Sequence, residues 1–163
     1  MKPLLPIALA AALLTTAGAA YVNTEYGFSV TPPGGWKQVS VPGTLVAFTG
    51  PLTGGFGPNF NLLVSKLPAG LTLKQLEEAG RAQLSQVITD YKFVGRRDVK
   101  MGGLPAVELT ITGRQGKFNL YFIQTYALKN NLAFVSTGTT QQATSGGFAA
   151  INASFVKTFA FTR

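Results

Sequence analysis

Residues 104–140 read LPAVELTITGRQGKFNLYFIQTYALKNNLAFVSTGTT, and this stretch carries the strongest periodic pattern in the chain. Apolar and polar side chains alternate along three runs, which predicts three long strands, at 104–112, 117–128 and 132–139. Each link is short and rich in residues that tolerate positive φ: GRQG contains two glycines and KNN contains two asparagines. The stretch therefore predicts an antiparallel meander.

The middle strand of this meander is apolar on both faces. Leu120 and Phe122 share one face with Tyr126, whereas Tyr121 and Ile123 point to the other. A strand that is apolar on both sides is usually buried on both sides. We therefore expect other structure to cover each face of the sheet.

The chain offers two amphipathic segments for this purpose. Residues 72–90 predict a helix, because Thr72 and Gln75 form a capping-box pattern and the apolar stripe that follows has helical spacing. Gly80 lies within that stripe and weakens the helix, which indicates close packing there. Residues 141–158 predict a second helix with Phe148, Ile151 and Phe155 on one face.

Shorter strands complete the expected fold, at 28–30, 45–49, 59–67 and 91–101 with a bulge at Gly95, and residues 159–162 are a candidate for a short final strand. Trp36 follows a Pro-Gly turn, and its large apolar body is expected to close that turn onto the core. The pattern indicates an α+β fold, in which an antiparallel β-sheet of about six strands is sandwiched by two main helices.

The first twenty residues differ from the rest. Lys2 supplies a positive charge, residues 4–14 are apolar apart from Pro6, and Ala17 and Ala19 form an Ala-x-Ala-like site. This pattern predicts a signal peptide at 1–20, cleaved after Ala19 or Ala20, and hence export to the periplasm, the cell envelope or the medium. The apolar run is shorter than the roughly 20 residues that span a bilayer. An uncleaved anchor or a buried helix is the alternative.

Residues 21–163 are expected to form a single domain, which has no second apolar run long enough to cross a membrane. The chain has no Cys and no His, so the domain must fold without disulfides. The commonest general base and the usual zinc ligands are also missing, and Ser-His-Asp and Cys-His sites are excluded. The sequence therefore predicts no enzyme, no cofactor and no metal site.

Two unusual catalytic arrangements remain as alternatives. A pair of carboxylates is not evident among the six acidic residues, since Glu77 and Glu78 are adjacent on a helix and diverge. A Ser–Lys pair is likewise not evident, because Ser65 and Lys66 point to opposite faces of a strand. An atypical envelope hydrolase stays open as an alternative, as does a carrier of a small apolar ligand or lipid, which would need an apolar cavity.

Basic residues suggest one candidate site. Residues 21–163 contain 13 basic and 6 acidic side chains, a net charge of +7. The possible anion or partner docking residues gather on one strand and the next hairpin turn: Lys92, Arg96, Arg97, Lys100, Arg114 and Lys117. They would suit an anionic envelope component or an unknown protein. Equally, charge protects an edge strand from pairing with other chains.

The even spacing of Lys92, Arg96 and Lys100 places them on one face of a regular strand, unless the bulge at Gly95 breaks the phase. Nucleic acid is not an expected partner, because Tyr91 and Phe93 are predicted to lie in the core rather than to stack on bases. The GRQGK stretch joins two strands, so it is a hairpin turn rather than a phosphate loop.

The glycine- and proline-rich loop at 50–58 is the second candidate, with Leu52 and Phe56 as possible contacts for an apolar ligand. The alternative is a mobile connector. The sequence Asn152-Ala153-Ser154 matches a glycosylation acceptor, but its place in a predicted helix argues against that use.

The order of elements resembles the Mog1/PsbP-like superfamily, which includes the bacterial DcrB-type proteins. The resemblance rests on YGFSV at 26–30, PGGW at 33–36, LTL at 71–73, MGGLPA at 101–106 and INASF at 151–155. It covers essentially all of residues 21–163 and implies an α/β/α sandwich around an antiparallel sheet.

The resemblance also implies a role in binding. The superfamily includes photosystem accessory subunits, a nuclear-transport factor that binds a small GTPase, and bacterial envelope proteins or chaperones. It has no shared catalytic motif to carry over to this chain. The metal-site histidines of photosynthetic members have no counterpart here, which argues against a photosystem-type role. We therefore expect a non-enzymatic, exported binding or accessory domain of the cell envelope.

Overall fold

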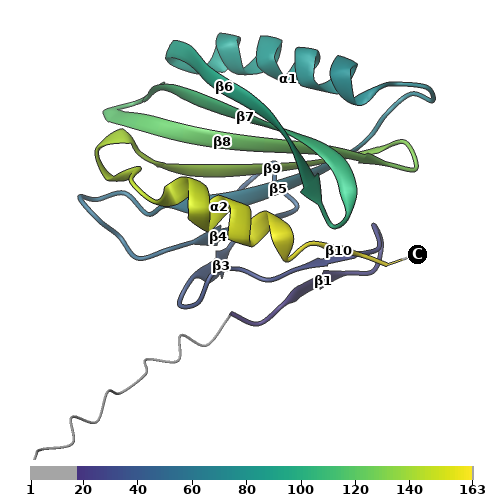
Figure 1. The fold of residues 1–163 in the computed structure, drawn as a ribbon. Helices are drawn as coiled ribbons and strands as arrows, with labels where there is room; N and C mark the ends of the chain where they lie inside the picture. Colours follow the sequence, from purple (N-terminus) through teal and green to yellow (C-terminus); the bar gives the residue numbers. More distant parts are fainter. Residues whose placement is uncertain (1–17, 163) are drawn as a thin grey trace, which may run out of the picture.

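The structure is a computed structural model that describes residues 18–162. Nearly all of the predicted signal peptide, residues 1–17, lies outside the described residues. Figure 1 shows a large twisted sheet with helix α1 (Leu73–Val87) packed along one side and helix α2 (Phe148–Lys157) across the other. Within residues 18–162, neither helix is long and apolar enough to cross a membrane.

Two antiparallel sheets form in the described residues. The large sheet has seven strands in the order β3 (Lys37–Val39), β4 (Val46–Thr49), β5 (Asn59–Lys66), β9 (Leu132–Gln141), β8 (Phe118–Lys129), β7 (Leu104–Gln115) and β6 (Thr89–Met101). The small sheet has three strands in the order β1 (Tyr21–Asn23), β2 (Phe28–Val30) and β10 (Ala160–Phe161). The α+β class is confirmed, but the expected number of about six strands is too low.

The two strands that the sequence did not predict, β1 and β3, are each three residues long. β3 has the sequence KQV and all three residues are exposed, so it carries no alternating apolar pattern. β1 is equally short and pairs with β2 from Tyr21 opposite Val30 to Asn23 opposite Phe28. Such short strands are stabilised by pairing with neighbouring strands, and local sequence patterns do not predict that pairing.

The predicted meander of three strands is confirmed as the consecutive neighbours β7, β8 and β9, and β6 pairs with β7 at its edge. The turn between β8 and β9 places both Asn130 (φ 51°) and Asn131 (φ 57°) in the left-handed region. Two successive positive φ values match the twist of a tight hairpin. The bulge near Gly95 is also confirmed, because the pairing of β6 with β7 shifts between Phe93 and Gly95.

The two faces of the meander pack against different layers. Leu109, Phe122 and Tyr126 belong to one hydrophobic cluster, which α1 covers with Leu73, Leu76 and Leu84. Ile123 and Ala127 point to the other face and join a second cluster beneath α2 and the small sheet. Both faces of the middle strand are therefore buried, as predicted.

Helix α1 begins as predicted. The Thr72 hydroxyl accepts a hydrogen bond from the backbone of Gln75 (3.2 Å), and the Gln75 side chain accepts one from the backbone of Thr72 (2.9 Å). Gly80 lies against the hydroxyl of Tyr126, and even a methyl group at position 80 would collide with that hydroxyl. The close packing expected at Gly80 is confirmed. The apolar stripe predicted for this helix leaves Glu77 mostly on the solvent side, but Glu77 is in fact buried.

Helix α2 is shorter than predicted, beginning at Phe148 rather than at residue 141. Gly147 precedes it with a φ of 80°, a left-handed conformation that ends the link from the short 3₁₀ turn η1 (Gln142–Thr144). Asn152 of α2 is fully buried. Its burial agrees with the prediction that this asparagine is not a glycosylation site.

Candidate functional site

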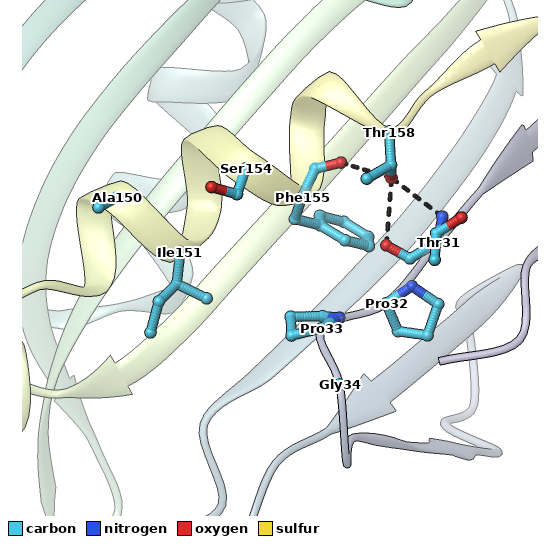
Figure 2. Close-up of a pocket in the computed structure, with 9 residues that line it drawn as sticks. All are labelled: Thr31, Pro32, Pro33, Gly34, Ala150, Ile151, Ser154, Phe155 and Thr158. Carbon is cyan, nitrogen blue, oxygen red and sulfur yellow. Dashed lines mark hydrogen bonds between the residues drawn. The ribbon is translucent and has the colours of Figure 1, made fainter. Parts of the chain in front are cut away.

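A groove of about 440 Å³ lies between α2 and the loop that follows β2. We call it the α2 groove, and Figure 2 shows its lining residues: Thr31, Pro32, Pro33, Gly34, Ala150, Ile151, Ser154, Phe155 and Thr158. Ser154 and the threonines 31 and 158 supply its polar side chains, and no lining side chain is ionisable. The groove is therefore suited to an apolar group rather than to acid–base chemistry.

Thr158 joins the two walls of this groove. Its hydroxyl lies 2.9 Å from the backbone nitrogen of Thr31, from which it accepts, and 3.1 Å from the backbone oxygen of the same residue. The same hydroxyl lies 2.7 Å from the backbone oxygen of Phe155. After Thr31 the chain enters Pro32 and Pro33, whose fixed φ keeps the loop extended beside the helix. The groove is thus a pre-formed feature of the fold.

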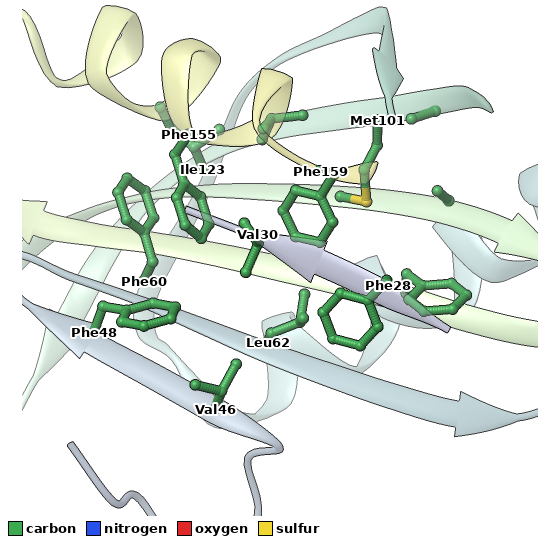
Figure 3. Close-up of a cluster of buried hydrophobic side chains, with 14 of the residues drawn as sticks. Phe28, Val30, Val46, Phe48, Phe60, Leu62, Met101, Ile123, Phe155 and Phe159 are labelled. Carbon is green, nitrogen blue, oxygen red and sulfur yellow. The ribbon is translucent and has the colours of Figure 1, made fainter. Parts of the chain in front are cut away.

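Ile151 is the large apolar residue of the groove that is exposed, with 41% of its surface accessible. Phe155 forms the buried floor and stacks on Phe60 with 4.2 Å between ring centroids. Trp36 stacks on Phe60 with 4.9 Å between ring centroids, which confirms that Trp36 closes its turn onto the core. Figure 3 shows Phe155 beside Phe60 and Phe48 in this cluster. The groove therefore rests on a rigid aromatic core.

The sequence did not single out the α2 groove. Its helix wall includes Ile151 and Phe155, which were expected to point toward the sheet together. The other wall comes from a proline loop more than a hundred residues earlier in the chain. The only local signal was the pair Pro32-Pro33, which ends the predicted strand at 28–30 and indicates no binding site by itself.

The predicted basic cluster does not form one surface. In the register of β6 with β7, Arg97 lies opposite Glu108 and the adjacent Arg96 lies opposite Leu109. The two arginines therefore point to opposite faces of the sheet. Lys92 lies opposite Thr112 and shares the Arg97 face, whereas Lys100 lies opposite Pro105 and shares the Arg96 face. The bulge at Gly95 therefore separates Lys92 from Arg96 and Lys100, which a regular strand would have aligned.

The arginines of this cluster form ion pairs with carboxylates. Arg96 Nε lies 3.0 Å from Glu77 Oε2 of α1, and the hydrogen bond to Glu77 raises the pKa of Arg96. Arg97 Nε lies 2.7 Å from Glu108 Oε1, and this hydrogen bond likewise raises the pKa of Arg97. Both carboxylates are buried, so each arginine neutralises a charge that would otherwise be costly.

The Arg97 pair extends into α2. Asn152 Nδ2 donates to Glu108 Oε2 over 3.1 Å, so a chain of polar contacts runs from β6 through β7 to the helix. Adjacent arginines thus connect the edge strand to the helices on both faces. Arg114 pairs with Asp90 at 3.1 Å on the surface, and Lys117 lies over the ring of Phe118. Anion docking at the six basic residues stays a prediction.

β6 is an edge strand of the large sheet. This agrees with the alternative explanation of its basic residues, in which charge protects an edge strand from pairing with other chains. Phe93, expected in the core, is 39% exposed, and the guanidinium carbon of Arg81 lies 4.0 Å from its ring centroid. A strand at the edge of a sheet has a neighbour on one side only, so this ring stays partly exposed.

The loop at 50–58 is folded back on itself. Thr53 and Phe56 form an isolated β-bridge, and Gln141 Nε2 donates to the backbone oxygen of Thr53 over 2.9 Å. Phe56 packs on Phe118 with 5.2 Å between centroids, while Leu52 is 76% exposed. The structure separates the two predicted contact residues, and apolar ligand binding by this loop stays a prediction.

The carboxylates of the described residues do not gather into a metal cluster or a buried pair. Within residues 18–162, no cluster of three or more acidic side chains could hold a metal ion. Glu77 and Glu108, the two buried carboxylates, lie on opposite faces of the sheet. Each binds an arginine rather than the other carboxylate.

A family model described as DcrB matches residues 29–150. Among curated proteins, no relative matches the chain. Solved structures with the same fold are numerous but distant in sequence.

PsbP of the cyanobacterium Synechocystis sp. PCC 6803 matches with a TM-score of 0.68 at 16% identity, over 88% of this chain and 91% of that one. LpqN of Mycobacterium tuberculosis, which is involved in cell envelope biogenesis, matches with a TM-score of 0.69 at 12% identity, over 89% and 90%. The Ran-binding protein Mog1p of Saccharomyces cerevisiae matches with a TM-score of 0.62 at 8% identity, over 88% and 94%. At these identities the likeness establishes the fold alone.

Proposed function

The chain belongs to the DcrB family, and from this premise we propose that it is an exported, non-enzymatic accessory domain of the cell envelope. We propose further that its partner is a protein that places an apolar side chain or short segment in the α2 groove. The signal-peptide pattern at residues 1–20 supports export. LpqN, the structural neighbour that is involved in cell envelope biogenesis, supports a location in the envelope.

The main support for a binding site at the α2 groove is the set of residues that line it. It combines an accessible apolar residue, Ile151, with a rigid floor and two prolines, and it contains no ionisable group. Apolar side chains in a pre-formed pocket are typical anchors of protein–protein interfaces. Little conformational entropy is lost on binding, because the loop is already tied to α2 by Thr158.

A site-specific crosslinking experiment tests this proposal. A photoreactive side chain replaces Ile151 in the exported protein, and a matched control carries it at Val22 of β1, which is 62% exposed. We expect one discrete envelope protein to be crosslinked from position 151 and not from position 22. Ile151→Asp should then weaken binding of the purified partner at least tenfold without changing the melting temperature. Equal crosslinking from both positions would contradict the proposal.

An anionic envelope component is a second candidate partner. Five of the six acidic side chains form ion pairs: Glu77, Glu78, Asp90, Asp98 and Glu108. The positive excess therefore resides largely on lysines, and it would attract an anionic surface in a salt-dependent way.

The matched test uses vesicles that contain phosphatidylglycerol. We expect Lys92→Glu with Lys100→Glu and Lys117→Glu to lower retention on these vesicles at low salt while the melting temperature stays near that of the original chain. Arg97→Glu is the contrasting variant, because it should lower the melting temperature by leaving Glu108 buried beside a second negative charge. Retention that the three lysine substitutions leave unchanged would contradict this candidate.

A further inference from the structure

A second groove, of about 250 Å³, lies on the opposite face of the large sheet. Helix α1 packs on β6, β7 and β8, and the same face of β9 and β5 continues beyond it. The groove runs between the C-terminal turns of α1 and these two strands, and we call it the α1-face groove. Its position is separate from the α2 groove and from the partner proposed there.

The floor of the α1-face groove is built by the register of three strands. Gln124 of β8, Thr137 of β9 and Asn61 of β5 lie directly opposite one another in one row. Thr139 and Asn59 lie side by side in the next row. The Cβ atoms of direct cross-strand neighbours are about 5 Å apart, so the amide and hydroxyl groups of these residues lie close together on one face of the sheet.

Some of these polar groups are held in place and others remain available. Gln124 donates to Thr137 Oγ1 over 2.9 Å and accepts from the hydroxyl of Tyr126, which fixes its amide. Asn61 is half-buried, and its side chain forms no hydrogen bond with any residue of 18–162. Its neighbour in the row on the other side is Ala47.

The opposite wall is apolar. It consists of Leu84, Val87 and Ile88 from the end of α1, and Val87 is 62% exposed. Aromatic rings of Phe56 and Phe122 close the groove. No lining residue of the groove is ionisable.

This lining selects among ligand classes. An anion would find no cation in the groove, and a cation would find no carboxylate. A hydrocarbon chain would cover Asn61 and the neighbouring threonines without satisfying their hydrogen bonds, which is unfavourable. A ligand that fits must be uncharged, must carry many hydrogen-bonding groups on one side, and must present apolar groups on the other.

We propose that the α1-face groove binds a neutral saccharide chain that carries N-acetyl groups. Ring hydroxyls and the acetamido N–H and C=O would meet the amides and hydroxyls of β5, β8 and β9. The acetyl methyl group and the apolar face of the sugar ring would meet the α1 wall and the two phenylalanines. Because this surface and the α2 groove share no lining residue, loss of one activity leaves the other intact.

Titration with chitotetraose, a neutral chain of four N-acetylated sugars, tests the proposal on the isotope-labelled mature protein. We expect backbone amide signals of residues 59–61 and 137–139 to shift with saturation at millimolar or lower concentration. Asn61→Leu should weaken binding about tenfold, the effect of losing hydrogen bonds worth roughly 1.4 kcal/mol. Val87→Lys, at an exposed position, should weaken binding by narrowing the groove while preserving the fold.

Asn119→Leu is the matched control, because Asn119 is an exposed asparagine of β8 outside the groove, and it should bind as the original chain does. Maltotetraose, which lacks acetamido groups, should bind at least tenfold more weakly than chitotetraose. Shifts that appear elsewhere, equal affinity for both sugars, or affinity that Asn61→Leu leaves unchanged would overturn the proposal. Binding of a neutral extended peptide in preference to chitotetraose would also overturn it.

Discussion

The two faces of the large sheet are covered in different ways. The α2 face is closed by a helix and a second sheet, and its core is dominated by stacked aromatic rings such as Phe60 and Phe155. The α1 face is covered by one helix over three strands, and its packing depends on a glycine contact at Gly80 and an ion pair at Glu77.

The two faces therefore differ in how much they contribute to stability and in how much surface they leave open for binding. Aromatic burial on the α2 face removes a large apolar area from water, which is the main source of folding free energy. The hydrophobic cluster on the α1 face contains fewer buried residues, so the exact position of that helix depends on close contacts and charge pairing. The half of this face beyond α1 retains polar side chains, and a binding site can occupy it without disturbing the core.

Truncation of the aromatic core should have the largest effect. Phe60 is fully buried and stacks with Trp36, Phe148 and Phe155, so Phe60→Ala should lower the free energy of unfolding by about 3–5 kcal/mol. Urea denaturation measures this loss. Phe93→Ala on the α1 face, where the ring is 39% exposed, should cost much less. Similar losses for both would refute the claim that the aromatic core dominates stability.

A methyl group at Gly80 should have the next largest effect. Gly80→Ala ordinarily stabilises a helix by up to about 1 kcal/mol, but here the new methyl collides with the hydroxyl of Tyr126, and overpacking of this kind costs about 1–3 kcal/mol. We expect a net loss of stability in thermal unfolding. Tyr126→Phe removes the hydroxyl, so the double variant should recover part of the loss. A Gly80→Ala variant more stable than the original chain would show that α1 can shift on the sheet.

The ion pairs of β6 provide a third test. Arg97→Met leaves Glu108 buried with only Asn152 as a partner, so the melting temperature should fall by less than in Phe60→Ala. Removing the charge with Glu108→Gln in the same chain should restore part of the loss, because a neutral amide is less costly to bury than an unpaired carboxylate. If the double variant is no more stable than Arg97→Met alone, the ion pair does not stabilise α2 through Glu108.

Alkaline pH should have the smallest effect. Burial raises the pKa of Tyr126 above its ordinary value of 10.0, so the unfolded chain loses this proton at lower pH than the folded chain. The contribution to stability is therefore complete below pH 10 and declines as the pH rises above it. Denaturation at pH 8 and at pH 10.5 should show this decline, and Tyr126→Phe should make it shallower. An unchanged slope in Tyr126→Phe would assign the decline to other groups.

Local patterns were sufficient wherever one segment contains its own signal. The capping box at Thr72, the two turns of the meander and the bulge at Gly95 were all predicted, because each depends on the conformational preferences of a few adjacent residues. Helix α2 was placed less well, because a 3₁₀ turn and Gly147 interrupt an otherwise helical pattern at residues 141–147.

The candidate sites were beyond the reach of local patterns. The spacing of residues 92, 96 and 100 predicted that they share one face of the strand, but the bulge places Lys92 on the opposite face from the other two. In addition, Arg96 and Arg97 form ion pairs with buried carboxylates. Glu77 was expected in water because its helix position is at the margin of the apolar stripe. Only the presence of Arg96 on a strand of the adjacent sheet makes its burial favourable.

The sequence by itself determined the α+β class, the meander, the capped first helix and the absence of the residue types that most catalytic and zinc sites require. These properties follow from composition and from periodicity along one segment. The tertiary structure alone decided which charges are paired and where the two grooves lie. Each groove is assembled from segments distant in the chain, Pro32 with Ile151 and Asn61 with Val87, and such pairs meet only when strand register and helix packing are fixed.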